Sequence, residues 1–196
     1  MAEIINYEEK SDEELAFLSI EDQSGFLHIM NRYQTKLLYY IRRISGVSIE
    51  EAEDVLQDVF IKVYRNLNDF DHDLKFSSWV YRIAHNQVIS DYRKKQARPQ
   101  SAGIDLSDLS LLNLASGLDI KKDIDNQLLR EAINQILDIM PVKYREVLIL
   151  KFFEEKDYAE ISDILKKPMG TVASLLNRAK QKFREEYEKR KSANIQ

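Results

Sequence analysis

The sequence contains no cysteine and few of the residues that interrupt regular secondary structure. Without cysteine the chain can form no disulfide, no thiolate zinc site and no thiol nucleophile, and such a composition suits a reducing compartment. Glycine (five) and proline (three) together account for eight of 196 residues, well below the usual share of about 12%. This deficit argues against a turn-rich all-β fold, so we expect a helical protein of the cytoplasm.

Long apolar runs and enzymatic motifs are also missing. No stretch approaches the roughly 18 apolar residues of a membrane-spanning helix, and the first 23 residues are acidic where a secretory signal would be basic. We find no glycine-rich phosphate loop, zinc-protease motif or hydrolase nucleophile motif, and His28, His72 and His85 share no metal-ligand spacing. We therefore expect no enzymatic activity, metal site, cofactor or direct membrane contact.

Apolar residues recur at helical spacing along most of the chain. Capping pairs, serine or aspartate with glutamate three residues later, predict helix starts at Ser11, Ser48 and Asp157. Gly46 is typical of a helix end, and Pro141 of a first helical position. These patterns predict an all-α fold.

Between residues 97 and 125 the helical pattern fails, and serine, aspartate, glycine and scattered leucine take its place. We interpret this stretch as a flexible linker with a helical turn near 107–114, whose leucines pack on another element. The predicted organisation is a helical domain at 10–96, the linker at 97–125, and a second helical domain at 126–190 that ends in a helix-turn-helix.

The net charge of −4 conceals two basic segments. Residues 76–100 hold five basic side chains and one acidic, and residues 166–196 hold nine and three, whereas the rest of the chain is acidic. Because the local field matters for binding, the average charge does not exclude a nucleic-acid partner.

Two short helices at 157–166 and 169–187, separated by a break of about three residues, predict the helix-turn-helix. The second would bury Val172, Leu176 and Phe183. Its opposite face would expose hydroxyl, amide and guanidinium groups, which suit base edges and phosphates: Thr171, Ser174, Asn177, Arg178 and Gln181. An ordinary helical hairpin with a solvated basic face is the alternative.

The segment MPVKYREVLILKFFEEKDYAEISDILKKPMGTVASLLNRAKQKFR resembles the C-terminal promoter-recognition domain of bacterial RNA polymerase sigma factors. EEAEDVLQDVFIKVYRNLNDF resembles the sigma-factor helix that binds the polymerase clamp, and FSSWVYRIAHNQVISDYRKKQ resembles the helix that opens the minus-ten element. The two domains resemble the extracytoplasmic-function (ECF) group of the sigma-70 family. This resemblance implies three partners, namely core RNA polymerase, promoter DNA and an anti-sigma factor.

The resemblance also implies roles for individual residues. The polymerase-binding candidates are Asp54, Gln57, Asp58, Lys62 and Arg65. The minus-ten candidates, where cations meet phosphates and aromatic or amide groups meet unpaired bases, are Asn68, Asp71, His72, Lys75, Trp79, Arg82, Asn86, Tyr92, Arg93, Lys94 and Lys95. The minus-thirty-five candidates are Lys167, Gly170, Thr171, Ser174, Asn177, Arg178 and Gln181. Trp79 fits either a core anchor, which we favour, or a wedge against DNA.

The sequence departs from the family pattern at several positions. Ala173 and Leu175 stand where cations are common, which removes phosphate contacts. Lys166 and Glu155 stand where glycine is common, and Lys166 implies either a left-handed residue that is not glycine or a different turn. Two other functions stay open from the residues alone. One is a free-standing helix-turn-helix regulator that acts without polymerase, and the other is an adaptor that has lost DNA binding.

Overall fold

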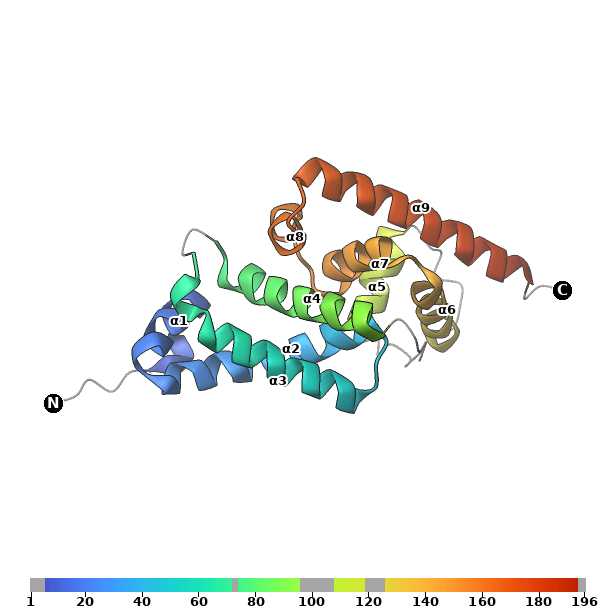
Figure 1. Ribbon diagram of the computed structural model, residues 1–196. Helices are drawn as coiled ribbons and strands as arrows, with labels where there is room; N and C mark the ends of the chain where they lie inside the picture. Colours follow the sequence, from blue (N-terminus) through green and yellow to red (C-terminus); the bar gives the residue numbers. More distant parts are fainter. Residues whose placement is uncertain (1–5, 72–73, 96–107, 119–125, 194–196) are drawn as a thin grey trace.

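The computed structural model describes residues 6–71, 74–95, 108–118 and 126–193. Within these ranges there is no strand, and no helix is both long and apolar enough to cross a membrane. The helices form two groups (Figure 1). The N-terminal domain contains η1 (Tyr7–Glu9), α1 (Asp12–Glu21), α2 (Gln23–Ser45), α3 (Ile49–Arg65), η2 (Leu67–Asp69) and α4 (Phe76–Lys95). The second group contains α5 (Asp108–Gly117), α6 (Asn126–Ile139), α7 (Val142–Leu148), the π-helical turn η3 (Ile149–Phe153), α8 (Tyr158–Leu165) and α9 (Met169–Ala193). The prediction of an all-α fold is confirmed.

The predicted helix boundaries of the N-terminal domain follow from side-chain capping. At the start of α1, Ser11 Oγ accepts a bond from the Glu14 amide at 3.1 Å, and Glu14 Oε2 accepts one from the Ser11 amide at 2.8 Å. Ser48 caps α3 through the Glu51 amide at 3.3 Å. Gly46 ends α2 with φ 68° and ψ 19°, the left-handed conformation that glycine adopts without a Cβ penalty.

An aromatic cluster holds the start of α4 against the domain core. The ring centroids of Phe70 and Phe76 lie 5.2 Å apart, and the Trp79 ring lies 5.3 Å from Phe70 and 5.6 Å from Phe76. Trp79 is only 5% exposed. Of the two roles expected for Trp79, its burial supports the core anchor.

The turn between α6 and α7 differs slightly from the sequence expectation. Pro141 is the residue before α7 rather than its first helical residue, because its ψ of 135° lies outside the helical region. Its carbonyl still accepts the amides of Tyr144 at 2.9 Å and Arg145 at 3.2 Å. Pro141 therefore caps the helix, which begins at Val142, one residue later than predicted.

The turn of the helix-turn-helix uses a residue that is not glycine. Asp157 and Glu160 form the predicted capping box at the start of α8, with bonds of 2.8 and 3.0 Å. Lys166 ends α8 with φ 52° and ψ 46°, which is the left-handed conformation and not the different turn that was the other possibility, and Glu155 also has a positive φ of 53°. A bond from Ser162 Oγ to the Lys167 carbonyl at 2.6 Å stabilises the turn.

Part of the predicted linker is a helix packed on the C-terminal domain. Helix α5 replaces the short turn expected near 107–114; its Leu114 is buried, and so is Leu118 directly after it. Gly117 lies directly against Phe152, where a Cβ atom would come within 2.1 Å of the ring, so no larger residue fits there. Arg184 Nε donates to the Leu118 carbonyl at 2.8 Å. The remaining predicted linker segments, 97–107 and 119–125, lie outside the described residues.

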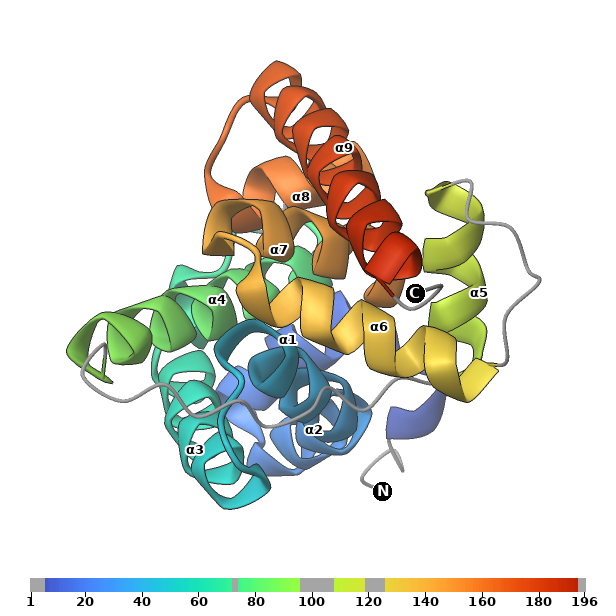
Figure 2. The same ribbon diagram turned by 90° about the vertical axis from the view of Figure 1, so that its right-hand side faces the viewer.

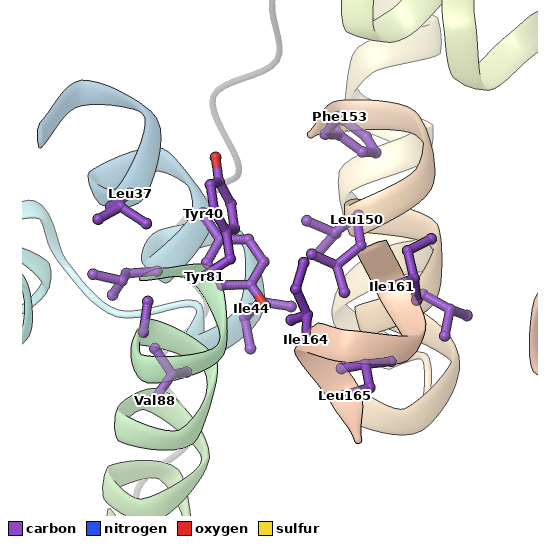
Figure 3. Close-up of a cluster of buried hydrophobic side chains, with 14 of the residues drawn as sticks. Leu37, Tyr40, Ile44, Tyr81, Val88, Leu150, Phe153, Ile161, Ile164 and Leu165 are labelled. Atoms are coloured by element: carbon purple, nitrogen blue, oxygen red, sulfur yellow. The ribbon is translucent and has the colours of Figure 1, made fainter. Parts of the chain in front are cut away.

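The two domains are in direct contact. Helix α4 lies beside α8, and α2 contacts α7 and η3 (Figures 1 and 2). Ile44 and Tyr81 face Leu150 and Ile164 across this interface (Figure 3). All four side chains are buried, so the two helical domains share a continuous hydrophobic contact.

Candidate nucleic-acid interface

Helix α9 buries one face and presents a polar face to solvent, as its spacing predicted. Val172, Leu176 and Phe183 are fully or almost fully buried. The exposed residues are Thr171, Ser174, Asn177, Arg178 and Gln181. Because the fold leaves this face uncovered, its hydroxyl, amide and guanidinium groups can meet a partner.

Local bonds orient part of the exposed face of α9. Ser174 Oγ donates to the Gly170 carbonyl one turn earlier at 2.9 Å, and Gln181 Nε2 donates to Glu185 Oε1 at 3.0 Å. Gly170 has open space where a Cβ would stand, since no heavy atom beyond its chain neighbours and its own helix backbone lies within 4 Å. Met169, which the sequence reasoning did not select, starts α9 with 57% of its surface exposed.

Lys167 differs from the other candidates near α9 because it contacts a buried carboxylate. Its Nζ atom lies 3.8 Å from Glu146 Oε1, and Glu146 is 5% exposed. Burial raises the pKa of Glu146, whereas Lys167 and Arg145 oppose that shift. Lys167 thus compensates a buried charge in this arrangement.

Ala173 and Leu175, where family members often carry cations, are both half-buried. Leu175 packs against the hydrophobic core. Its apolar character is therefore used in packing, and this chain has no cation at either position.

The exposed face of α3 carries the five polymerase-binding candidates, all of them on the protein surface. Gln57 and Arg65 also line an apolar groove between α2 and α3 with a volume of about 920 Å³. The groove walls include Leu27, Ile61 and Tyr64, which are exposed. Sequence reasoning missed the groove, because apolar residues at helical spacing do not reveal which of them stay uncovered.

Two of the candidates on α3 contact α4 through Gln87. Lys62 Nζ donates to Gln87 Oε1, while Gln87 Nε2 donates to Asp91 Oδ2 at 2.8 Å and lies 3.4 Å from Asp58 Oδ2. Gln87 is 7% exposed. Lys62 and Asp58 therefore help to fix α3 against α4, a structural contribution that their sequence positions did not predict.

The minus-ten candidates are only partly brought together. Asn68, Asp71 and Asn86 are exposed, and Arg82 is half-exposed. Lys75 lies 3.6 Å from Asp157 Oδ2 and 3.7 Å from Glu160 Oε1, both at the start of α8. His72 lies outside the described residues, as do the side chains of Tyr92, Arg93, Lys94 and Lys95 on the last turn of α4.

Buried polar groups cross the domain contact beside α4. Glu154 accepts bonds from Arg43 Nη1 at 2.9 Å and from the Tyr81 hydroxyl at 2.6 Å. Nearby, His85 Nδ1 lies 3.1 Å from the Tyr40 hydroxyl, and His85 Nε2 lies 3.7 Å from Glu146 Oε2. Burial is the main reason that the pKa of His85 falls to about 4, so the imidazole is neutral at pH 7.

Comparisons with known proteins identify both domains. Residues 29–98 match the family described as Sigma-70 region 2, and residues 130–183 match Sigma-70, region 4. The chain is 34% identical over 169 residues to the ECF RNA polymerase sigma factor SigW of Bacillus subtilis, covering 84% of this chain and 90% of the relative. It is 31% identical over 164 residues to the ECF RNA polymerase sigma-E factor of Escherichia coli K12, covering 82% and 85%.

Solved structures show the same fold. CnrH, in complex with the cytosolic domain of CnrY, aligns with a TM-score of 0.66 and 22% identity over 90% of this chain and 96% of that chain. The sigma factor RpoE of Bartonella quintana, in complex with the anti-sigma factor NepR, aligns with a TM-score of 0.62 and 18% identity over 83% and 96%. With both domains matched in order, the chain belongs to the ECF group of the sigma-70 family of RNA polymerase sigma factors.

Proposed function

We propose that this chain is a transcription initiation factor that binds core RNA polymerase through α3 and recognises promoter DNA through α4 and α9. The observation that carries the proposal is the uncovered polar face of α9, the second helix of the helix-turn-helix. A helix of this kind places its polar side chains in the major groove. The family matches in both domains do not favour a free-standing regulator.

We assign the binding of polymerase, of the minus-ten element and of the minus-thirty-five element to different surfaces, according to where the exposed groups lie. Asp54 and Gln57 lie on the exposed surface of α3 and form no hydrogen bond with the described side chains of α4, so they suit a protein partner that provides complementary charge. Asn68, Asp71 and Asn86 lie on or near α4 and suit the single strand of the minus-ten element. Thr171, Ser174, Asn177 and Arg178 suit the minus-thirty-five duplex.

We also infer that an anti-sigma factor regulates the chain. Support comes from the RpoE structure, which contains the anti-sigma factor NepR. Such a partner would act by covering surfaces that polymerase or DNA needs.

Reconstitution with core polymerase and promoter DNA tests the proposal. The full chain should form a stable complex with core enzyme and should direct it to promoter DNA. Tight promoter binding by the isolated chain, without any stable complex with core enzyme, would contradict it.

A charge reversal on α3 tests the polymerase surface. Asp54→Lys should weaken affinity for core polymerase by roughly tenfold, or about 1.4 kcal/mol, because it replaces a complementary charge with a repulsive one. Glu21→Lys makes the same charge change at an exposed position on α1 and should leave the affinity unchanged. Equal affinities for the two variants would refute the role assigned to α3.

A further inference from the structure

We propose that Arg43, Tyr81 and Glu154, here called the interdomain cluster, hold the free chain in a closed state that cannot occupy both promoter elements. The inference rests on the proposed function, because it assumes that α4 and α9 recognise the two elements. It adds a regulatory device within the chain itself, separate from any partner protein.

The interdomain cluster joins three elements across the domain contact. Arg43 comes from α2, Tyr81 from α4, and Glu154 from the end of η3. Arg43 donates a hydrogen bond to one oxygen of the Glu154 carboxylate, and Tyr81 donates one to the other. The side chains of Arg43 and Glu154 are 10% and 5% exposed. The Arg43 guanidinium also lies 5.2 Å from the centre of the Phe153 ring.

The surroundings of the cluster make its pairing important. Ile44, Leu150 and Ile164 are buried beside Tyr81 (Figure 3), so a charge of the cluster that lost its bonded partner would be shielded from water. The charge of Lys156 also acts on Glu154, but more weakly than that of Arg43. Removing one partner of a buried pair is therefore far more disruptive than removing an exposed charge. A pair of this kind favours the one arrangement in which the two charges are paired.

Further polar contacts surround the cluster on the same interface. Lys156 Nζ, from the loop before α8, lies 3.2 Å from Ser77 Oγ and 4.7 Å from the centre of the Tyr81 ring. Lys75 is paired with the carboxylates of Asp157 and Glu160. The closed state thus engages a minus-ten candidate with acidic groups of the other domain.

Local structure places Glu154 at this interface. It directly follows a π-helical turn, a feature that is frequent at functional positions, and its amide donates to the Ile149 carbonyl at 3.0 Å. The next residue, Glu155, has the positive φ at the position where the sequence pattern of the family carries glycine.

The closed state and promoter recognition exclude each other on distance. The positions that name the minus-ten and minus-thirty-five elements are about 25 base pairs apart, which is about 85 Å along the duplex at 3.4 Å per base pair. In the closed state Lys75, just before α4, lies within 4 Å of the start of α8, and α9 follows α8 after three residues. One closed chain therefore cannot reach both elements, and the domains must separate first.

Distance measurements between fluorophores test the closed state in the full chain. Because the sequence has no native cysteine, Asn31→Cys on α2 and Glu188→Cys on α9 can carry a donor and an acceptor at exposed positions. The parent chain should give a single short-distance population in the absence of polymerase. Adding Glu154→Ala should raise the ratio of long-distance to short-distance populations at least tenfold.

Two further variants separate the cluster from general effects. Glu155→Gln changes the neighbouring carboxylate, which bonds Asn113 within the C-terminal group, and should keep the short-distance population. Replacing both charges, with Arg43→Met and Glu154→Met together, should restore part of the closed population, since neither charge is then left buried alone. Unchanged helical circular dichroism in each variant shows that the chain is folded.

The outcomes distinguish this proposal from the proposed function. A parent chain with long distances, or a Glu154→Ala chain that stays as closed as its parent, would overturn the closed state whatever the polymerase experiments show. If the Glu154→Ala chain opens as described but the protein never forms a complex with core polymerase, the role of the interdomain cluster in closing the chain still holds. The proposed function is then contradicted instead.

Discussion

Arg43 on α2 and Arg178 on α9 carry the same guanidinium group in contrasting surroundings. Arg43 is buried and bonded to Glu154, whereas Arg178 is exposed on the polar face of α9. The fold satisfies the first group internally and leaves the second for a partner. The comparison shows that residue type alone does not separate structural from recognition roles; burial and bonding do.

The largest expected effect concerns stability. Arg43→Ala should lower the free energy of unfolding by about 3 kcal/mol, because the Glu154 carboxylate is left buried without its cation. Arg178→Ala should change it by less than about 0.5 kcal/mol, as is usual for exposed positions. Urea unfolding of both variants measures the difference, and equal midpoints would remove the contrast between the two arginines.

A pH dependence should follow from the buried histidine. The pKa of His85 is lowered to about 4 in the folded chain, whereas its usual value, expected in the unfolded chain, is about 6.5. At pH values below about 6.5 the unfolded chain therefore binds more protons than the folded chain does. The contribution of His85 should therefore favour the folded chain less as pH falls, by about 2 kcal/mol between pH 7 and pH 5.

A matched variant isolates that contribution, because other groups also titrate near His85. Tyr40, Glu146 and Lys167 face His85, and the raised pKa of Glu146 acts in the opposite direction. His85→Asn removes only the imidazole titration. The stability advantage of the parent over His85→Asn should shrink from pH 7 to pH 5 in urea unfolding, and a constant difference would contradict the prediction.

On the exposed side of the comparison, Arg178→Ala should weaken promoter binding by the polymerase-bound chain about tenfold, or about 1.4 kcal/mol. The effect should appear in DNA binding and not in affinity for core polymerase. Arg190→Ala, on the same helix beyond the helix-turn-helix, is the matched control. Similar losses for both variants would indicate a general effect of charge.

The smallest expected effect concerns the turn before α9. Lys166→Gly should stabilise the folded chain by about 0.5 kcal/mol. Glycine removes the steric penalty of the left-handed conformation, and this gain is partly offset because glycine has more conformational entropy in the unfolded chain. Lys166→Ala keeps a Cβ atom in the left-handed conformation and should not stabilise the chain. Thermal unfolding compares the two, and a loss of stability in both would show that Lys166 is not strained.

Much of the fold could be predicted because its signals are local. The capping boxes at Ser11 and Asp157, the left-handed Gly46 and the buried stripe of α9 are each determined by residues within a few positions of one another. The exposed face of α9 follows from the same periodicity. The boundary at Pro141 was one residue off, and α5 was longer than the turn expected there, because such ends depend on what the helix packs against.

The contacts between distant segments could not be predicted in this way. Glu154 and Arg43 are 111 residues apart, and nothing near either residue indicates the other. The same holds for Gln87 with Lys62, and for Lys75 with the start of α8. Glu155 was visible as a departure from the family pattern, but the position of the preceding Glu154 against Arg43 and Tyr81 was not.

The sequence by itself determined the helices, their caps, the two basic segments and the resemblance to ECF sigma factors, because periodicity, composition and motifs act over short stretches. Only the tertiary structure decided which polar side chains stay available. Arg178 remains open to a partner while Arg43, Tyr81, His85 and Glu154 are enclosed where the domains meet. The physical reason is that burial and bonding depend on neighbours brought together by folding, and a residue's own position in the chain does not specify them.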